Sequence, residues 1–388
     1  MYERLKILLF SPYLPAIDTS GFARKLYDYI RFGSQRGYKI YLVSFWSEED
    51  KKRIGAIRCH CTRVHLYYLK DYSCYPFNAS IKAKVRSICE NEGIDILQCE
   101  KAYMASYLAH DINIPLILVE HEILSASFSA RIALENNFIN KIIFYARKIK
   151  KTIEEKKWYK KFDKIIVFSE EDRRIIKNFY KIENIDVIPL GINLQDYALK
   201  NAKEKLYDIM FMGNFSHFPN VDAVLHFYKR ILPLIRNRLP NISVIIAGAE
   251  PPPIIKKLQE IDKNITVTGY IHNVIDIYSK SKVFIAPIRY GTGMHFKVLE
   301  ALAMRIPTVT TSIGARGIIF KECVRIADTE KELAEAVIEL LIEPDKYNSL
   351  VKIGELILEK YYNWDIILDR HENIYNKLLN LNSERISK

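Results

Sequence analysis

Short runs of aliphatic and β-branched residues alternate with longer amphipathic stretches along almost the whole chain. The first example is complete, because LKILLF at residues 5–10 is followed by an amphipathic stretch at residues 22–37 and by YKIYLVSF at residues 38–45. Apolar strands that alternate with helices are typical of a parallel sheet with helices packed on both of its faces. The pattern therefore predicts an α/β fold.

Two such series follow each other. Further strands are predicted at residues 64–69, 94–98, 115–120, 164–169 and 185–191 in the first series, and at residues 207–213, 242–248, 265–269, 282–287 and 306–311 in the second. A polar segment between residues 190 and 205 predicts a hinge. We therefore predict two Rossmann-like, doubly wound parallel-sheet domains, residues 1–195 and 196–362, which face each other across a cleft. Residues 363–388 contain apolar positions at helical spacing and predict a terminal helix.

Length and composition fit this organisation. A chain of 388 residues suits two domains, and 49% hydrophobic residues supply apolar material for two cores. The longest apolar runs are shorter than the roughly 18 residues of a membrane span, and the first ten residues suit a strand better than a signal peptide, so we expect a cytoplasmic protein. Cys59 and Cys61 lack a second ligand pair at metal-binding spacing, so we predict reduced cysteines and no metal site.

The net charge of +12 is concentrated in the first half of the chain. Residues 1–200 contain 33 Lys and Arg against 24 Asp and Glu, which leaves +3 for the remainder. The densest basic patch, residues 147–164, has nine basic and three acidic residues with Trp158, Tyr159 and Phe162 between them. This composition suits an anionic membrane surface, and a solvated helix face explains it equally well. No nucleic-acid-binding motif accompanies the charge, so we expect no nucleic-acid partner.

The sequence APIRYGTGMHFKVLEALA at residues 286–303 carries the most specific chemical pattern. Its glycine loop follows a predicted strand and opens a predicted helix, so backbone N–H groups at the positive end of the helix can meet an anion such as a phosphate. Lys297 and Glu300 share a helix face, where one can meet a phosphate and the other can accept hydrogen bonds from sugar hydroxyls. Phe296 replaces the third glycine of a dinucleotide fingerprint, and no P-loop occurs. Taken alone, the pair is better explained as an exposed Lys/Glu pair.

Over nearly its whole length the chain resembles the GT-B glycosyltransferases, specifically the retaining family 4 group (glycosyl transferases group 1), which uses nucleotide sugars. The resemblance is strongest in FMGNFSHFPNVDAVLHFYKRILPLI, VIIAGAEPP and the segment from VTGYIHN to SIGARGI, which occur in the family's order. In the first half, SPYLPAIDTSGFARKLYDYI, FDKIIVFSEED and PLGINLQDY are similar to its first glycine-containing loop, a late strand and its interdomain segment. The resemblance implies that the terminal helix crosses back onto the first domain.

The resemblance implies a donor site in the second domain. Glu300 corresponds to the family's ribose-binding glutamate, and Lys297 corresponds to the basic residue on the donor diphosphate. The other donor-binding positions are the phosphate cradle, the loop after the first strand, and the segment that holds the base: Gly291, Thr292, Gly293, Met294 and His295; Gly213 and Asn214; Tyr270 and Ile271. Thr292 stands where the family commonly has a second glutamate, and His295 stands where it often has another basic residue.

In the first domain, the resemblance places Gly21 in a loop that approaches the donor phosphates and His121 near the transferred sugar. His121 is expected to act as a polar contact to the sugar rather than as a general base, and a purely structural histidine is the alternative. Arg24 and Lys25 are candidate contacts to the acceptor or to phosphate, and solvated helix-face charge explains them equally well. The catalytic set expected from the sequence is therefore Lys297, His121 and Glu300.

The expected activity is that of a hexosyl-type glycosyltransferase that moves a sugar from a nucleoside-diphosphate sugar to a hydroxyl acceptor with retention. The sequence contains no Asp-x-Asp, so we expect Lys297, the helix N-terminus and His295 to stabilise the leaving diphosphate without a metal or other cofactor. The basic first half favours a lipid-linked or glycan acceptor at the inner face of the membrane. Two alternatives stay open: a GT-B enzyme of the nucleotide-sugar 2-epimerase type, and a catalytically reduced GT-B binding protein.

Overall fold

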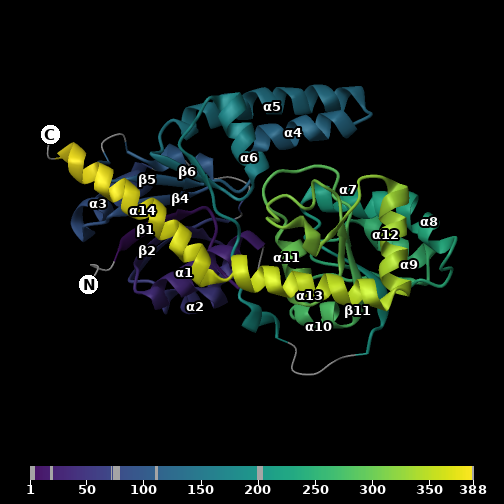
Figure 1. The fold of residues 1–388 in the computed structure, drawn as a ribbon. Helices are drawn as coiled ribbons and strands as arrows, with labels where there is room; N and C mark the ends of the chain where they lie inside the picture. The colour runs from purple at the N-terminus through teal and green to yellow at the C-terminus, as the bar shows by residue number, and fades with distance from the viewer. Residues whose placement is uncertain are drawn as a thin grey trace. The chain divides into compact units, whose positions relative to one another are not determined.

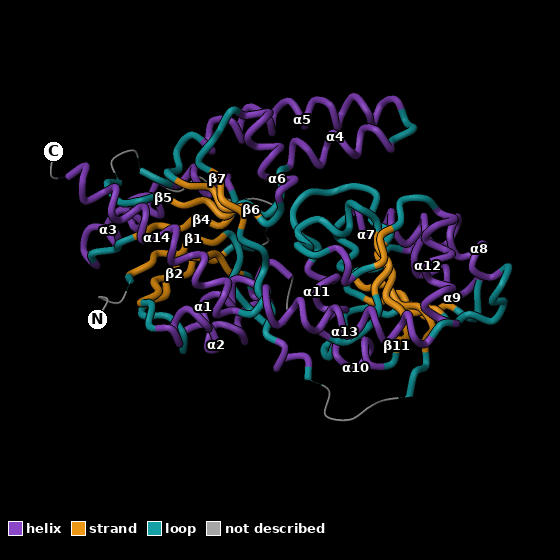
Figure 2. Tube along the Cα trace, viewed as in Figure 1, coloured by secondary structure: helices purple, strands orange, loops and turns teal. Residues whose placement is uncertain are grey.

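The computed structural model describes residues 5–17, 21–70, 72, 79–109, 112–198 and 204–386. The chain forms two compact units, Met1–Gly191 with Trp364–Lys388, and Ile192–Asn363. Each unit has one fully parallel sheet (Figures 1 and 2). The predicted hinge segment includes residues 199–203, which lie outside the described residues.

The first unit contains a seven-stranded sheet in the order β3-β2-β1-β4-β5-β6-β7. Its strands are β1 (Lys6–Ser11), β2 (Lys39–Trp46), β3 (Arg63–Tyr68), β4 (Ile96–Glu100), β5 (Leu116–Val119), β6 (Lys164–Val167) and β7 (Ile185–Val187). Its helices are α1 (Gly21–Arg36), α2 (Ile54–Arg58), α3 (Ala79–Glu92), α4 (Leu124–Leu134), α5 (Phe138–Tyr159), α6 (Glu170–Ile175) and α14 (Trp364–Ile386).

The second unit contains a six-stranded sheet in the order β10-β9-β8-β11-β12-β13. Its strands are β8 (Tyr207–Met212), β9 (Val244–Ala247), β10 (Ile265–Val267), β11 (Ser281–Ala286), β12 (Thr308–Thr310) and β13 (Arg325–Ile326). Its helices are α7 (Phe218–His226), α8 (Leu232–Arg236), α9 (Pro253–Ile261), α10 (Val274–Ser279), α11 (Phe296–Ala303), α12 (Glu330–Ile342) and α13 (Pro344–Tyr361). The α/β class with two doubly wound parallel sheets is confirmed, and every strand predicted from the apolar runs is present.

In both sheets the strand order reverses beside the first strand of the unit. The reversal lies between β1 and β4 in the first sheet and between β8 and β11 in the second. Loops that leave the carboxyl ends of such neighbouring strands diverge to opposite faces of the sheet, and ligands of doubly wound folds bind in the crevice between them. This topology indicates where each unit holds its functional residues.

The terminal helix α14 packs on its own unit. The Trp364 ring stacks on Phe32 of α1 with the ring centroids 5.6 Å apart. The Tyr375 hydroxyl donates to Gln98 Oε1 of β4 at 2.8 Å, and the Arg36 guanidinium pairs with Glu372 at 2.8 Å. The helix therefore joins residues far apart in the sequence into one core.

The basic patch at residues 147–164 lies on a helix and on the connection that follows it. It covers the second half of α5 and then leaves the helix to enter β6. Tyr159 and Phe162 are buried in the core of the first unit, and Trp158 packs against that core. These aromatic residues therefore anchor the end of α5 to the sheet, and membrane contact by the basic patch stays a prediction.

Candidate active site

The glycine loop of the second unit lies at the point where the strand order of its sheet reverses. Strands β8 and β11 are paired in parallel, with Ile209 opposite Val283 and Met210 opposite Phe284. Gly213 directly follows β8, and the segment that ends in Gly291–His295 follows β11. Two of the predicted donor-binding loops therefore leave neighbouring strands at the same sheet edge.

The loop conformation requires its glycines. Gly291 has φ +131° and Gly293 has φ +79°, a region that side-chain-bearing residues rarely adopt. The loop is held from the segment after β12, because the Arg316 guanidinium donates to the Gly291 carbonyl at 2.6 Å. A Cβ on Gly317 would lie 2.7 Å from Met294 Cγ, so this glycine makes room for Met294. The segment after β12 thus holds the glycine cradle in its conformation.

Lys297 and Glu300 lie on the less buried face of helix α11. Its buried residues are Phe296, Val298, Leu299, Ala301 and Leu302, which form the face that packs into the unit. His295 occupies the N-cap position, and its side chain does not cap the helix. The positive end of the helix is therefore oriented toward the glycine loop, where an anion would be stabilised.

The Lys297 ammonium lies against the loop that follows β8. It donates to Asn220 Oδ1 on α7 and lies 4.8 Å from the centroid of the Phe211 ring. A Cβ on Gly213 would be 2.8 Å from Asn220 Cγ and 3.0 Å from Lys297 Nζ, so both side chains would have to shift to make room for it. Burial lowers the pKa of Lys297 to about 7, and the Glu300 carboxylate opposes the shift. Among its described partners, no carboxylate is in hydrogen-bonding contact with the lysine.

Asn220 and Gly248 support the same loop, and the sequence analysis named neither. Asn220 Nδ2 donates to the Asn214 carbonyl at 2.6 Å, so one amide connects the loop after β8 to Lys297. Gly248 follows β9 with φ +141°, and a Cβ there would meet the Gly213 carbonyl oxygen at 1.9 Å. Gly248 could have been identified by its position directly after a strand at this sheet edge, whereas Asn220 lies on α7 and gives no such signal.

Glu300 is held by a tyrosine from the segment before β8. The Tyr197 hydroxyl donates to Glu300 Oε1 at 3.0 Å, and Tyr197 is itself buried. The carboxylate has further acceptor capacity for the hydroxyls of a ligand. Tyr197 belongs to PLGINLQDY, which the sequence analysis took only as an interdomain segment.

The described contacts bring Gly213, Asn214 and Lys297 together, and the glycine cradle leads directly into the helix that carries Lys297. Tyr270 and Ile271 lie in the loop after β10, at the far edge of the sheet, where Tyr270 is half exposed and its ring meets His272 edge-on. Thr292 lies between the two glycines, and the His295 ring lies beside Gly291, with Cε1 3.7 Å from a Cβ built there. Base binding by Tyr270 and Ile271 stays a prediction.

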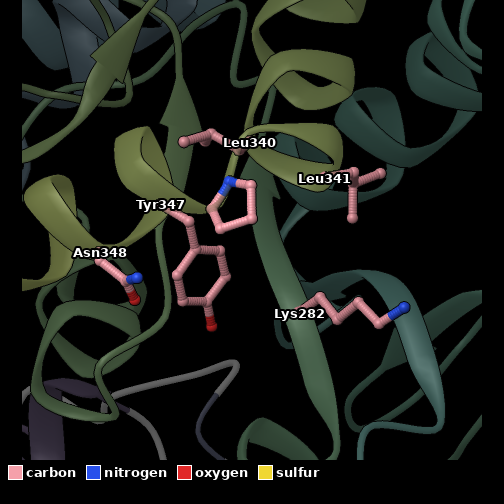
Figure 3. Close-up of a pocket in the computed structure, with 6 residues that line it drawn as sticks. Lys282, Leu340, Leu341, Tyr347 and Asn348 are labelled. Carbon is pink, nitrogen blue, oxygen red and sulfur yellow. The ribbon is translucent and has the colours of Figure 1, made fainter.

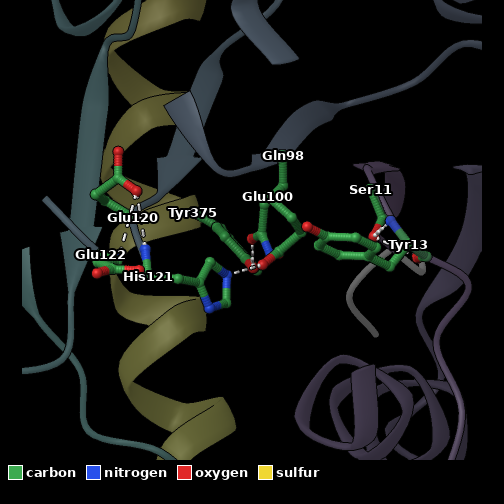
Figure 4. Close-up of polar contacts among 8 residues, drawn as sticks. All are labelled: Ser11, Tyr13, Gln98, Glu100, Glu120, His121, Glu122 and Tyr375. Atoms are coloured by element: carbon green, nitrogen blue, oxygen red, sulfur yellow. Dashed lines mark hydrogen bonds and ion pairs between the residues drawn. The ribbon is translucent and has the colours of Figure 1, made fainter. Parts of the chain in front are cut away.

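In the first unit, His121 joins a buried polar chain at the carboxyl end of β4 (Figure 4). His121 Nε2 lies 2.6 Å from Glu100 Oε2, and Gln98 Nε2 donates to Glu100 Oε1 at 2.7 Å. Burial, with the charges of Lys25 and Lys101, lowers the pKa of His121 well below its usual range. Burial raises the pKa of Glu100 to about 7 despite Lys25 and the Gln98 hydrogen bond. A neutral His121 ring can donate a hydrogen bond from one nitrogen and accept one at the other.

Glu100 and Lys101 are candidate residues that the sequence analysis missed. They end the strand that borders the point of reversal in the first sheet. Lys101 has φ +76°, a strained conformation for a residue with a side chain, and its Nζ lies 5.0 Å from the Tyr13 ring. The sequence feature that could have identified them is their position at the end of a predicted strand.

The other candidates of the first unit lie on α1. Gly21 begins the helix and is exposed. Arg24 Nε lies 3.9 Å from Asp28 Oδ2 on the same helix. Lys25 is buried, and its Nζ lies 3.1 Å from the Phe168 ring centroid. The solvated-face explanation is therefore wrong for Lys25, which lies in the interior of the unit.

Two further observations concern alternative sites. A pocket of about 150 Å³ opens beside Lys282, Leu340 and Tyr347, where β11 begins, so it lies at the opposite sheet edge from the glycine cradle (Figure 3). Within the part of the chain that the structure describes, no group of three or more His, Cys, Asp or Glu side chains is arranged to hold a metal ion.

Comparison with known families connects both units to sugar transfer. The model of glycosyltransferase family 4 matches residues 19–196. The model of glycosyl transferases group 1 matches residues 207–343. Each model thus covers most of one unit, and the second includes the glycine cradle, Lys297 and Glu300.

An uncharacterized 44.6 kDa protein in the cps region of Klebsiella pneumoniae is 24% identical over 258 residues, which are 62% of this chain and 63% of that protein. The chain thus spans less than two thirds of that relative. Sucrose-phosphate synthase from Thermosynechococcus elongatus has TM-score 0.75 at 15% identity and covers 97% of this chain and 100% of its own. The Anabaena protein Alr3699/HepE, solved with UDP and glucose, has TM-score 0.69 at 12% identity, with 96% and 100% covered. These structures share the fold, and with the two matching family models they show that the chain belongs to the GT-B glycosyltransferases of family 4 (glycosyl transferases group 1).

Proposed function

We propose that this glycosyltransferase transfers a hexosyl group from a nucleoside-diphosphate sugar to a hydroxyl of a lipid-linked or glycan acceptor, with retention and without a metal ion. The observation that carries the proposal is the position of Lys297 Nζ, which lies beside Gly213 on a helix that begins directly after the glycine cradle. A diphosphate placed there would meet a fixed cation, a helix N-terminus and a glycine cradle at once. The UDP and glucose bound by the Anabaena protein support a nucleoside-diphosphate sugar as donor.

Lys297 acts on the leaving group in this proposal. When the bond between the anomeric carbon and the diphosphate oxygen breaks, negative charge grows on the diphosphate. An ammonium that is fixed before the reaction stabilises this charge without having to reorganise. The bound diphosphate also raises the lysine pKa from about 7 toward its ordinary value, so the lysine is charged when it is needed.

Glu300 orients the donor in this proposal. Tyr197 fixes one carboxylate oxygen of Glu300, and the remaining acceptor positions suit two neighbouring hydroxyls of a ribose. Because Lys297 and Glu300 lie three residues apart on one helix face, the ribose and the diphosphate of one nucleotide can contact both side chains.

Retention needs no strong protein base. The acceptor oxygen bonds to the anomeric carbon on the face that the diphosphate leaves, and the acceptor proton passes to a diphosphate oxygen. His121 remains a polar contact to the sugar, since its low pKa keeps it neutral and Glu100 already engages its Nε2. Its role therefore differs from that of the leaving-group cation.

The donor part is tested by titrating UDP, and then other nucleoside diphosphates, into the protein. Lys297→Ala should weaken binding about 10- to 100-fold, the usual effect of removing a hydrogen-bonded charge. A screen of nucleotide sugars for hydrolysis and for protection against heat then identifies the donor. Absence of binding by every nucleoside diphosphate would refute the proposed donor site, and binding without hydrolysis or transfer would favour a binding protein.

A further inference from the structure

A chain of hydrogen-bonded side chains runs through the first unit from α14 to His121 (Figure 4). The Tyr375 hydroxyl donates to Gln98 Oε1 at 2.8 Å, and Gln98 Nε2 donates to Glu100 Oε1 at 2.7 Å. The other oxygen of Glu100 lies 2.6 Å from His121 Nε2. Tyr375, Gln98 and Glu100 are buried. Because a buried polar group without a partner is costly, each contact of this chain needs one donor and one acceptor.

The Glu100 carboxylate determines the direction of the two hydrogen bonds that it accepts. With a pKa of about 7, Glu100 is mostly ionised at pH 8. An ionised carboxylate only accepts hydrogen bonds, so both of its neighbours must donate. His121 is neutral, because burial lowers its pKa well below the usual range, and a neutral imidazole has a single N–H group. The proton of His121 therefore lies on Nε2, and Nδ1 has a free lone pair.

The other end of the chain fixes the orientation of the Gln98 amide. With its nitrogen toward Glu100, Gln98 turns its carbonyl toward Tyr375, which donates to it. The Tyr375 oxygen can then accept from the Tyr29 hydroxyl at 2.6 Å and from His371 Nδ1 at 3.1 Å. Turning the amide over would place its N–H group against the Tyr375 hydroxyl and force these contacts to reverse. The amide nitrogen of Gln98 is therefore held toward Glu100.

The imidazole ring of His121 is held so that its second nitrogen is available to a ligand. The ring packs between Phe22 and Phe168, with centroid distances of 4.3 and 5.1 Å. Turning the ring over would break the 2.6 Å contact with Glu100. Among the described residues, no hydrogen bond engages Nδ1, and the side chain is 10% exposed. Nδ1 is thus an acceptor that a bound sugar can reach.

We propose that Gln98 and Glu100 are positioning residues that keep the proton of His121 on Nε2, so that Nδ1 accepts a hydrogen bond from a hydroxyl of the transferred sugar. A nitrogen that only accepts selects a group that can donate, so it favours a hydroxyl over a carboxylate or a deoxygenated carbon. The contact to the sugar rests on the proposed function, which places His121 beside that sugar. The position of the proton does not, because it follows from the buried chain alone.

The test is a long-range ¹H–¹⁵N NMR spectrum of the histidine rings in the full chain at pH 8, which separates protonated from unprotonated ring nitrogens. The signals of His121 are those that disappear in His121→Gln. The native chain should have the proton of His121 on Nε2. In Glu100→Gln, Gln98 still donates to the carbonyl at position 100, so the new NH₂ group faces Nε2 and the proton should move to Nδ1. A native proton on Nδ1, or a proton that stays on Nε2 in Glu100→Gln, would overturn the inference.

Exchanging the two side chains provides the rescue. In Q98E/E100Q, the carboxylate at position 98 accepts from Tyr375 and from the amide at position 100, whose carbonyl then faces His121. The proton should return to Nε2, and a proton that stays on Nδ1 would contradict the inference. The matched control is Glu330→Gln, which removes a carboxylate 3.7 Å from another histidine, His226, and should leave His121 unchanged. Unchanged melting temperatures and UDP binding show that the variants are folded.

The contact to the sugar is tested by the release of nucleoside diphosphate from the donor that the nucleotide-sugar screen selects. In Glu100→Gln, kcat/KM should fall about fivefold, because the sugar hydroxyl no longer finds an acceptor at Nδ1. It should recover in Q98E/E100Q, with UDP affinity unchanged in both. A proton moved to Nδ1 with unchanged kcat/KM would overturn the sugar contact. Absence of any cleaved donor would refute the proposed function and this contact with it, while the NMR spectrum would still decide the position of the proton.

Discussion

Replacing Lys297 with arginine should abolish a pH dependence of nucleotide binding that the native lysine creates. In the free protein, burial lowers the pKa of Lys297 to about 7. A bound diphosphate brings negative charge to Nζ and raises this pKa toward 10.5. Above pH 7 the lysine must therefore take up a proton when the nucleotide binds, so affinity falls as the pH rises.

The size of this pH dependence follows from the change in the Lys297 pKa on nucleotide binding. At pH 8 a group with a pKa of about 7 is mostly neutral, so binding takes up about 0.9 proton. Between pH 7.5 and 8.5 the dissociation constant should rise about eightfold, whereas below pH 6 the lysine is charged in both states and the dependence disappears. Arginine keeps its charge throughout this range.

Calorimetric titration of UDP at pH 8, in buffers of different ionisation enthalpy, measures the number of protons that are taken up when UDP binds. The native chain should show an uptake about 0.9 proton larger than Lys297→Arg, and any titration of the nucleotide itself is common to both proteins. Equal proton uptake by the two proteins would refute the placement of Lys297 on the diphosphate. So would native affinity in Lys297→Ala.

Three further predictions concern other residues. Glu300→Ala should weaken UDP about tenfold and weaken 2′-deoxy-UDP less; equal losses for both ligands in parallel titrations would exclude a contact to the ribose 2′-hydroxyl. Gly248→Ala should lower the unfolding free energy by more than about 2 kcal/mol in urea denaturation, because its Cβ would meet the Gly213 carbonyl oxygen at 1.9 Å. The control Gly55→Ala should be neutral or stabilising, because a Cβ at Gly55 has nothing within 4 Å. His121→Ala should reduce sugar transfer while leaving UDP affinity unchanged in the same titration, and weaker UDP binding would place it on the nucleotide instead.

Much of the fold could be predicted because the apolar runs are short and clearly separated. The predicted strand KVFIAP corresponds to β11 at Ser281–Ala286, and YDIMFMG corresponds to β8. Strand β13 was missed because it has two residues, too few for a periodic signal. Such an element is stabilised by its pairing with β12, which is a tertiary property.

The candidate site could be predicted where its signal is local. The glycines at residues 291 and 293 and the pair Lys297 and Glu300 lie within ten residues of each other. Asn220 could not be found this way, because its contact with Lys297 joins residues 77 apart in the sequence. The burial of Tyr159 and Phe162 could not be predicted from residues 147–164, because aromatic residues look alike in sequence whether they face lipid or a core.

The most direct test of the proposed function is a transfer assay with the donor that the nucleotide-sugar screen selects, in the native chain and in Lys297→Ala. The account predicts that the native chain cleaves this donor and releases nucleoside diphosphate, and that Lys297→Ala loses at least about 100-fold in kcat/KM, because a fixed leaving-group cation is removed. Donor cleavage that is equally fast in both proteins would contradict the account.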